Sequence, residues 1–337
     1  MELKSKEKSV DLEKEVFNIK NKSMPNGSWL WWFWLFFFNN PKNSETPRQL
    51  MILWSTRNSK EMECNNLKIK INQNPNRSIL NGAVAAWYFD GEKMNHNFLL
   101  EPCNFKIKDK ELSSDSTVPT YFSVDKNKNI VKIGNKFEFI TKAENKHSFT
   151  SPIYQTNTYI SNKGYTMLKL NHLNLNGKVE NKPIHGSAYF QRVLVNSPLS
   201  SWYWGLVHFE NGGVMTYFNP YFLGKSFRKD ISFFDGKEMH KFDDIILKKN
   251  GEKTPSFIVS GENKNEKINF IVNSYSHSSW TLKKKSLGII PSKLIYNEYP
   301  SVVSEFKLIN KKTGEKITLE NLGKSVGNAE HGTGLLL

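Results

Sequence analysis

The hydrophobic residues of this chain fall in short runs without sustained helical spacing. Most runs are rich in β-branched and aromatic residues and are bounded by Asn, Gly, Lys or Pro, which is the pattern of β-strands. The clearest predicted strands are Leu50–Ser55, Ala83–Phe89, Ile130–Ile133, Phe137–Ile140, Gly213–Phe218, Ile268–Asn273 and Glu305–Ile309. Many short strands at close spacing predict an all-β fold built from sandwiches or barrels.

Turn-forming dipeptides separate several of the predicted strands. They are Asp90-Gly91, Asn176-Gly177, Asn211-Gly212, Asp235-Gly236 and Asn250-Gly251. Asp-Gly and Asn-Gly accept the positive φ angles of tight hairpins, so each pair is predicted to join two antiparallel strands.

The apolar phase changes within one long predicted strand. Leu168 and Leu170 have one parity, whereas Leu173 and Leu175 have the other. A strand buries only one parity on a given face, so a bulge near His172 is predicted to reconcile its two halves.

The two halves of the chain share a spaced pattern of aromatic residues. Six residues recur at one constant offset, namely Phe17, Pro25, Ser28, Trp29, Trp31 and Phe36 as Phe190, Pro198, Ser201, Trp202, Trp204 and Phe209. Further on, Met51 recurs as Met215 after a longer loop over 39–49, and YFDGEKM recurs as FFDGKEM. The shared order predicts a duplicated β-unit. We therefore predict an N-terminal extension over residues 1–15, a first domain over 16–163 and a second over 164–337.

Composition supports large cores and limits the class of partner. Aromatic residues make up 13% of the 337 residues, which excludes a globally disordered chain. The net charge is +15, but the basic residues are scattered and few are Arg, so we predict no nucleic-acid partner. Contact with an anionic membrane surface remains an alternative for this charge.

The two cysteines and the longest apolar run indicate in which cellular compartment the protein is expected. Cys64 and Cys103 form no CxxC pair, so neither a zinc site nor a disulfide framework is predicted, and both read as free thiols. The run Trp29–Phe38 is shorter than the roughly 20 residues of a membrane span. The residues before it mix lysines with acids, unlike a signal peptide. We expect a cytoplasmic protein, with peripheral membrane contact as an option.

Three segments together carry a resemblance to a known family. HGSAYFQRV (His185–Val193), SWYWGLVHFENG (Ser201–Gly212) and the strand through Tyr217 resemble the hydroxyneurosporene synthase (carotenoid 1,2-hydratase) and AttH superfamily. GNAEHGTG (Gly327–Gly334) resembles the closing strand of such domains. The resemblance implies two lipocalin-like (calycin-type) antiparallel β-barrels in tandem. It also implies binding of a large apolar molecule such as an isoprenoid or lipid.

At the matching positions, this sequence keeps the family's aromatic residues and carries an amide in place of the family's acid. The retained residues are Tyr189, Trp202, Trp204 and Tyr217. The family's acid and His positions fall on Phe190, Gln191 and Arg192, and the acid of its Tyr-x-Asp falls on Asn219. Hydration of an alkene requires a Brønsted acid, and an amide cannot serve as one. The hydratases' own proton donor is therefore missing at Asn219.

The candidate site residues are chosen by the strand face that they share and by the chemistry of their side chains. Trp202, Trp204 and His208 are spaced by even steps, so they share one face of a strand. The indoles offer flat surface to a polyene, and His208, Tyr217 and Tyr189 are the candidate proton-transfer groups. Packing of a barrel core is the alternative for these residues.

Arg192, Gln191 and Asn219 complete the predicted ligand-binding set. Arg192 alternates with Phe190 and Leu194, so it lies inside if those residues face inward. It is then a ligand anchor or the partner of an acid such as Glu210, Glu298 or Glu330, and the remaining alternative is plain exposure. Glu330-His331 is interpreted as a strand end and not as a dyad, because adjacent strand residues face opposite ways.

The leading hypothesis is a protein that encloses a large apolar molecule in an aromatic-lined pocket. The sequence leaves open whether the protein also catalyses a reaction. The enzymatic alternative is a non-redox hydration, cyclisation or isomerisation. No metal or cofactor is expected, because no HExxH or HxH spacing occurs. The alternatives are a non-catalytic carrier and a lipid-binding protein of the membrane surface.

Overall fold

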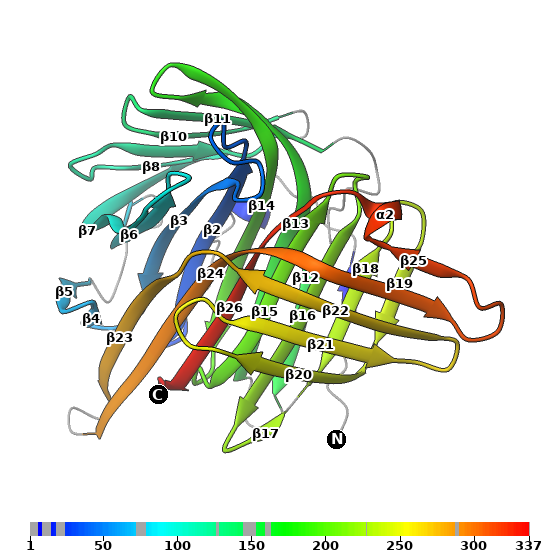
Figure 1. Cartoon of the computed structure of the whole chain (residues 1–337). Coiled ribbons are helices and arrows are strands. Elements are labelled where there is room, and N and C mark those ends of the chain that lie inside the picture. The colour runs from blue at the N-terminus through cyan, green and yellow to red at the C-terminus, as the bar shows by residue number, and fades with distance from the viewer. Residues whose placement is uncertain are drawn as a thin grey trace. The chain divides into compact units, whose positions relative to one another are not determined.

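The computed structural model describes residues 6–8, 15–17, 24–71, 79–125, 128–143, 153–158, 163–226, 228–286 and 290–336. These residues form β-strands almost throughout, together with a four-residue helix, α2 (Leu319–Leu322). Each predicted strand segment coincides with a strand of the structure, although Gly213 of the segment Gly213–Phe218 precedes its strand, and the all-β prediction is confirmed (Figure 1). None of the helices in the described ranges is both long and apolar enough to span a membrane.

The chain divides into two compact units. The first comprises Met1–Asn39, Gln49–Tyr88 and Asn95–Pro198, and the second comprises Asn40–Arg48, Phe89–Met94 and Leu199–Leu337. This division falls later than the boundary predicted between residues 163 and 164. The reason is that β13 (Lys163–Val179) and β14 (Lys182–Asn196) are neighbours in the sheet of the first unit. The predicted extension over 1–15 supplies β1 (Lys6–Lys8), which pairs with β12 (Ile153–Thr158).

The first unit is a closed antiparallel barrel of 10 strands. Its order is β13-β11-β10-β9-β8-β7-β6-β3-β2-β14, and β14 pairs with β13 to complete the ring. The remaining strands are β2 (Trp29–Phe38), β3 (Arg48–Arg57), β6 (Ile79–Phe89), β7 (Met94–Lys108), β8 (Glu111–Ser114), β9 (Thr120–Ser123), β10 (Asn129–Ile133) and β11 (Phe137–Lys142). A hairpin of β4 (Glu61–Cys64) and β5 (Leu67–Lys70) lies outside this ring. Closure leaves the ring without a free edge.

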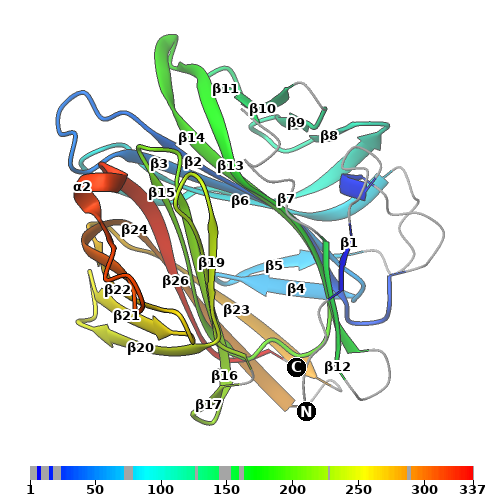
Figure 2. The ribbon, with the colours of Figure 1, turned by 90° about the vertical axis from the view of Figure 1, so that its right-hand side faces the viewer.

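The second unit is a curved antiparallel sheet of order β19-β18-β16-β15-β26-β24-β22-β21-β20 (Figure 2). Its strands are β15 (Ser201–Phe209), β16 (Val214–Phe222), β17 (Lys225–Ser226), β18 (Asp230–Phe234), β19 (Met239–Phe242), β20 (Asp244–Asn250), β21 (Ser256–Glu262), β22 (Glu266–Ser274), β23 (Ser278–Ser286), β24 (Ile290–Asn310), β25 (Lys316–Thr318) and β26 (Ser325–Leu335). Among the described residues β19 and β20 do not pair with each other, so the sheet remains open there.

The duplicated sequence pattern corresponds to a repeated set of strands. The hairpin of β2 and β3 in the first repeat matches the hairpin of β15 and β16 in the second. The turn between β6 and β7 matches the turn between β18 and β19, each with a glycine at positive φ. The aromatic repeat therefore marks equivalent strands in the two units.

The turn and bulge predictions have different outcomes. Gly91, Gly212, Gly236 and Gly251 all have positive φ in turns, as predicted. The prediction of a turn at Asn176-Gly177 is wrong, because β13 continues through these residues. The turn is formed instead by Glu180 and Asn181 at φ of 51° and 66°.

The bulge predicted near His172 is confirmed. The β13–β14 register shifts between Leu170 and Leu173, so the leucines on both sides of the bulge enter the first core. The two cysteines also agree with prediction, since Cys64 and Cys103 are buried free thiols. Burial raises the pKa of each thiol to about 12.

Candidate functional site

The predicted site residues of β14 lie on opposite faces of the first unit's sheet. Arg192 has the parity of the core residue Phe190, and its side chain is 8% exposed. Burial lowers the pKa of Arg192 to about 10, and the Glu15 carboxylate opposes this shift. Tyr189 and Gln191 occupy the other face, where Tyr189 Oη donates a hydrogen bond to Gln191 Oε1 at 2.9 Å.

The predicted residues of β15 share a face, but this face is turned away from the second core. The core-facing side chains of β15 are Tyr203, Val207 and Phe209. Trp202, Trp204 and His208 have the opposite parity, and His208 is only 2% exposed. They therefore do not line the interior of the second unit. We call their side of the sheet the outer face.

Tyr217 and Asn219 of β16 lie on the core side. Tyr217 is 1% exposed and crosses Gly205 of β15, where a Cβ would meet its ring at 2.2 Å. Burial raises the pKa of the Tyr217 hydroxyl. Tyr217 Oη and Asn219 Oδ1 are buried without a hydrogen-bond partner among the described residues. The predicted site is thus distributed over the first unit and both faces of the second unit's sheet.

A polar cluster that the sequence did not predict lies on the outer face. We call Trp202, Tyr296, Glu298, Asn328 and Glu330 the Glu330 cluster. Glu330 of β26 is paired directly with Glu298 of β24, and Gly332 is paired with both Trp202 and Tyr296. Directly paired residues of antiparallel strands project to the same face, so neighbouring strands bring these side chains together.

Both carboxylate oxygens of Glu330 are held by hydrogen bonds. Tyr296 Oη donates to Glu330 Oε1 at 2.6 Å, and Trp202 Nε1 donates to Oε2 at 3.0 Å. Asn328 Nδ2 donates to Glu298 Oε2 at 3.3 Å. The carboxyl group of Glu330 is therefore fixed in position and orientation within the face.

Gly332 allows this arrangement to form. A Cβ at Gly332 would lie 2.5 Å from the Trp202 ring, so only glycine lets the indole lie flat across β26. The indole then reaches β24, where its ring centroid is 5.6 Å from that of Tyr296. The small residue on the middle strand thus brings two aromatic donors to one carboxylate.

The environment of Glu330 favours its protonated form. The side chain is 5% exposed, and burial raises the pKa of its carboxyl to about 7, although the hydrogen bonds from Tyr296 and Trp202 act in the opposite direction. Glu298, at the paired position, is completely buried. A carboxyl group that titrates near pH 7 can both donate and accept protons in neutral solution.

Further polar atoms on this face have no partner. Asn328 Oδ1, Ser278 Oγ and Trp280 Nε1 are buried without a hydrogen bond within the described ranges. Ser278 is paired with Glu298, and Trp280 is paired with Tyr296, so both side chains project to the same face as the Glu330 cluster. Buried polar atoms are normally hydrogen-bonded, and these orphaned atoms point to a bound molecule or water. In the described part of the chain, no three His, Cys, Asp or Glu side chains are grouped to hold a metal.

The neighbour of Glu330 in sequence lies on the core side. His331 Nε2 is 2.9 Å from Tyr221 Oη, and Tyr203 stacks on the imidazole with ring centroids 4.2 Å apart. Burial lowers the pKa of His331 to about 4, with Lys249 adding to the shift, so the imidazole is neutral at pH 7. The prediction that Glu330 and His331 form no dyad is confirmed, because the sheet separates their side chains.

The sequence indicated Glu330 only as a possible partner of Arg192, because Glu330-His331 resembles a strand end. A signal was present, since Glu330 is an acid in a segment otherwise composed of small residues and His331. Its partners Tyr296 and Glu298 lie on another strand, and only the register of β24 against β26 shows that they meet.

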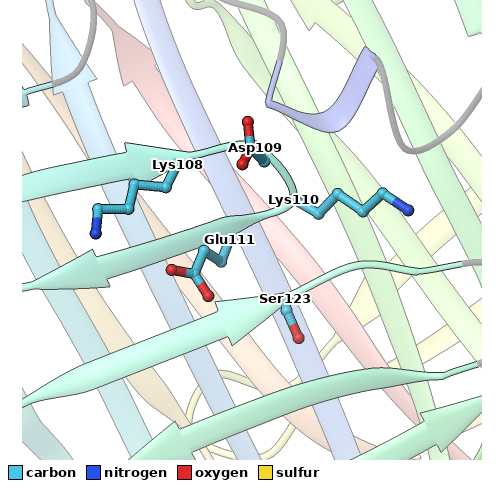
Figure 3. A pocket seen from close by; sticks show the side chains of 5 residues that line it. All are labelled: Lys108, Asp109, Lys110, Glu111 and Ser123. Carbon is cyan, nitrogen blue, oxygen red and sulfur yellow. The ribbon is translucent and has the colours of Figure 1, made fainter.

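A surface depression at the β7–β8 turn of the first unit offers a different kind of site. It is lined by Lys108, Asp109, Lys110, Glu111 and Ser123 (Figure 3). Figure 3 shows Lys108 and Lys110 pointing in opposite directions from the turn. This charged and open lining does not suit a large apolar molecule.

Comparison with known proteins shows a likeness of fold. No protein-family model and no curated protein matches the sequence. CghA matches with a TM-score of 0.50 and 9% identity, over 93% of this chain and 89% of its own. A protein of Nitrosomonas europaea assigned as AttH gives 0.48 and 10%, over 94% and 98%. Kievitone hydratase of Nectria haematococca gives 0.43 and 8%, over 93% and 90%. At these identities the match to CghA supports the fold alone.

Proposed function

We propose that this chain binds a large apolar molecule, of isoprenoid or lipid type, against the Glu330 cluster and transfers a proton to it without redox chemistry. One observation carries the proposal. A buried carboxyl group is held at both oxygens by Tyr296 and Trp202, beside a second buried carboxyl group. Such a group is costly to bury for stability alone, and perturbed acids of this kind cluster at functional sites.

The proposed chemistry begins with the proton of Glu330. In a hydration, the carboxylic acid gives its proton to one alkene carbon, and water then attacks the other carbon. The attacking water returns a proton to the carboxylate, so the net change is the addition of water to the double bond. In an isomerisation or cyclisation, the carboxylate instead recovers a proton from a different carbon. The face of the Trp202 indole, fixed beside Glu330, stabilises the developing positive charge.

The position of Glu330 supports a different proton donor from the one expected at Asn219. The hydratase-like acid position carries an amide, and Asn219 lies on the core side. Glu330 offers a Brønsted acid on the outer face, together with the indole that the family resemblance singled out. We infer that the proton donor of this chain lies on a different strand from the one expected.

The first test identifies a ligand and then a reaction. Native mass spectrometry of the purified protein, followed by organic extraction, is expected to recover a bound apolar molecule. Acyclic isoprenoids incubated with the protein in D₂O are expected to gain deuterium at carbon. Glu330→Gln is expected to lower that turnover by about 10²–10⁴-fold with ligand binding retained.

The matched control is Glu320→Gln, an exposed glutamate of α2. It is expected to leave turnover unchanged. Undiminished turnover in Glu330→Gln would exclude Glu330 as the proton donor. Binding without turnover in the unmodified protein would favour the carrier alternative. Recovery of no apolar ligand, and no binding of any offered one, would overturn the whole proposal.

A further inference from the structure

The turn between β16 and β17 exposes two consecutive large apolar side chains. Phe222 is 39% exposed and Leu223 is 86% exposed. Leu223 also has a φ of 47°, in the left-handed region that glycine and asparagine enter readily and leucine does not. A leucine here strains the backbone and gains nothing from burial within the chain. Its presence is explained if a partner covers it.

Basic residues flank the exposed turn. Lys225 and Lys229 are exposed and form no ion pair with other residues that the structure describes. Arg228 is paired with Asp230 at 2.7 Å, which removes the nearby acid from competition for these lysines. Figures 1 and 2 both show the β16–β17 hairpin projecting at the lower end of its sheet. The projecting turn therefore combines an apolar tip, formed by Phe222 and Leu223, with the positive charges of Lys225 and Lys229 beside it.

We propose that this turn docks the protein on an anionic lipid surface. Phe222 and Leu223 would enter the interfacial region of the bilayer, and Lys225 and Lys229 would lie among the acidic headgroups. Apolar insertion and attraction to acidic lipids each contribute a weak affinity, and reversible anchoring arises from their combination. The overall charge of +15 adds a long-range attraction of the same sign.

The size of the feature argues for lipid over a folded protein partner. A stable protein interface buries at least about 1,000 Å², far more than two side chains at a turn can provide. Among the residues that the structure describes, the other exposed large hydrophobic side chains are Met239, Ile246 and Ile258, and they belong to β19, β20 and β21. Two side chains at a turn form a small apolar feature that is suited to insertion. The inference does not depend on the chemistry of Glu330.

The test is co-sedimentation of the full chain with vesicles of phosphatidylcholine alone or with about one-third phosphatidylserine. The unmodified protein is expected to bind the anionic vesicles and to release as salt rises, because screening weakens headgroup attraction. The double substitution Phe222→Ser with Leu223→Ser is expected to reduce binding at least tenfold. Lys225→Glu with Lys229→Glu is expected to abolish the preference for phosphatidylserine.

The matched control is Ile246→Ser with Ile258→Ser, which removes two exposed apolar side chains from the edge of the same unit. It is expected to bind vesicles as the unmodified protein does. Leu223→Gly relieves the positive φ, so it is expected to keep or raise the melting temperature while weakening binding. Equal binding by the tip variants, or no binding by the unmodified protein, would overturn the proposal. A lipid-independent dimer that the tip variants lose would also overturn it.

Discussion

At the residue scale, the orientation of single side chains decides where the chemistry lies. Trp202 and Tyr203 are adjacent, yet one donates to Glu330 on the outer face and the other stacks on His331 on the core side. Both faces of β15 carry aromatic residues, so the usual alternation of apolar and polar side chains does not mark the inside. The sequence could predict that Trp202, Trp204 and His208 share a face, but not which face it is.

Glu330 gives the first prediction at this scale, a pH dependence of stability. Its ordinary pKa is 4.5 and its folded value is about 7, so between these values the folded state keeps a proton that the unfolded state has lost. The folded state therefore binds more protons there, and stability falls as pH rises from about 4.5 to about 7. Below this window the contribution is fully present, and above it no further change is expected from this group.

Glu330→Gln removes this titration because its amide stays neutral. The free energy of unfolding is measured with urea at pH 5 and at pH 8 for both proteins. From pH 5 to pH 8, the value for the variant minus the value for the unmodified protein should increase by about 1 kcal/mol or more. The exposed Glu320→Gln variant should show no such relative change. A constant difference between the two proteins at both pH values would place the folded pKa of Glu330 near its ordinary value.

At the element scale, strands were predictable where one residue type dominates and turns carry glycine. All predicted strands were confirmed because β-branched and aromatic runs have few alternatives to extended structure. The Asn176-Gly177 turn was wrong because β13 gains cross-strand hydrogen bonds with both β11 and β14 by continuing past it. Pairing between strands outweighed the local turn preference, and pairing is not visible in a local sequence pattern.

The cross-strand contact of Gly332 with Trp202 gives a prediction at this scale. Gly332→Ala places a methyl group 2.5 Å from the indole, so the ring must move and its hydrogen bond to Glu330 is lost. A loss of about 1–3 kcal/mol in the free energy of unfolding is expected. Trp202→Phe removes the N–H and part of the ring, so Gly332→Ala should cost less in that background. Equal costs in both backgrounds would show that the methyl group acts elsewhere.

At the scale of the whole molecule, the duplication was visible in the sequence, while the point of division was not. The repeat begins near Phe17 and again near Phe190, yet β13 and β14 complete the first ring before the second repeat's hairpin starts. The boundary predicted at the bend lies before these two strands, whereas the division by contacts lies after them. Ring closure is a long-range property, and it depends on β14 pairing with β2 over a large sequence separation.

Truncation tests this division directly. A fragment ending at Pro198 retains all the strands of the ring, whereas a fragment ending at residue 163 loses β13 and β14. The shorter fragment would leave β11 and β2 as unpaired edges and expose the apolar faces of both, so it should aggregate or remain unfolded. The longer fragment should give a cooperative thermal transition and a β-type circular dichroism spectrum. Cooperative folding of the shorter fragment would show that the first ring does not require β13 and β14, and that the domain boundary lies where the strand bends.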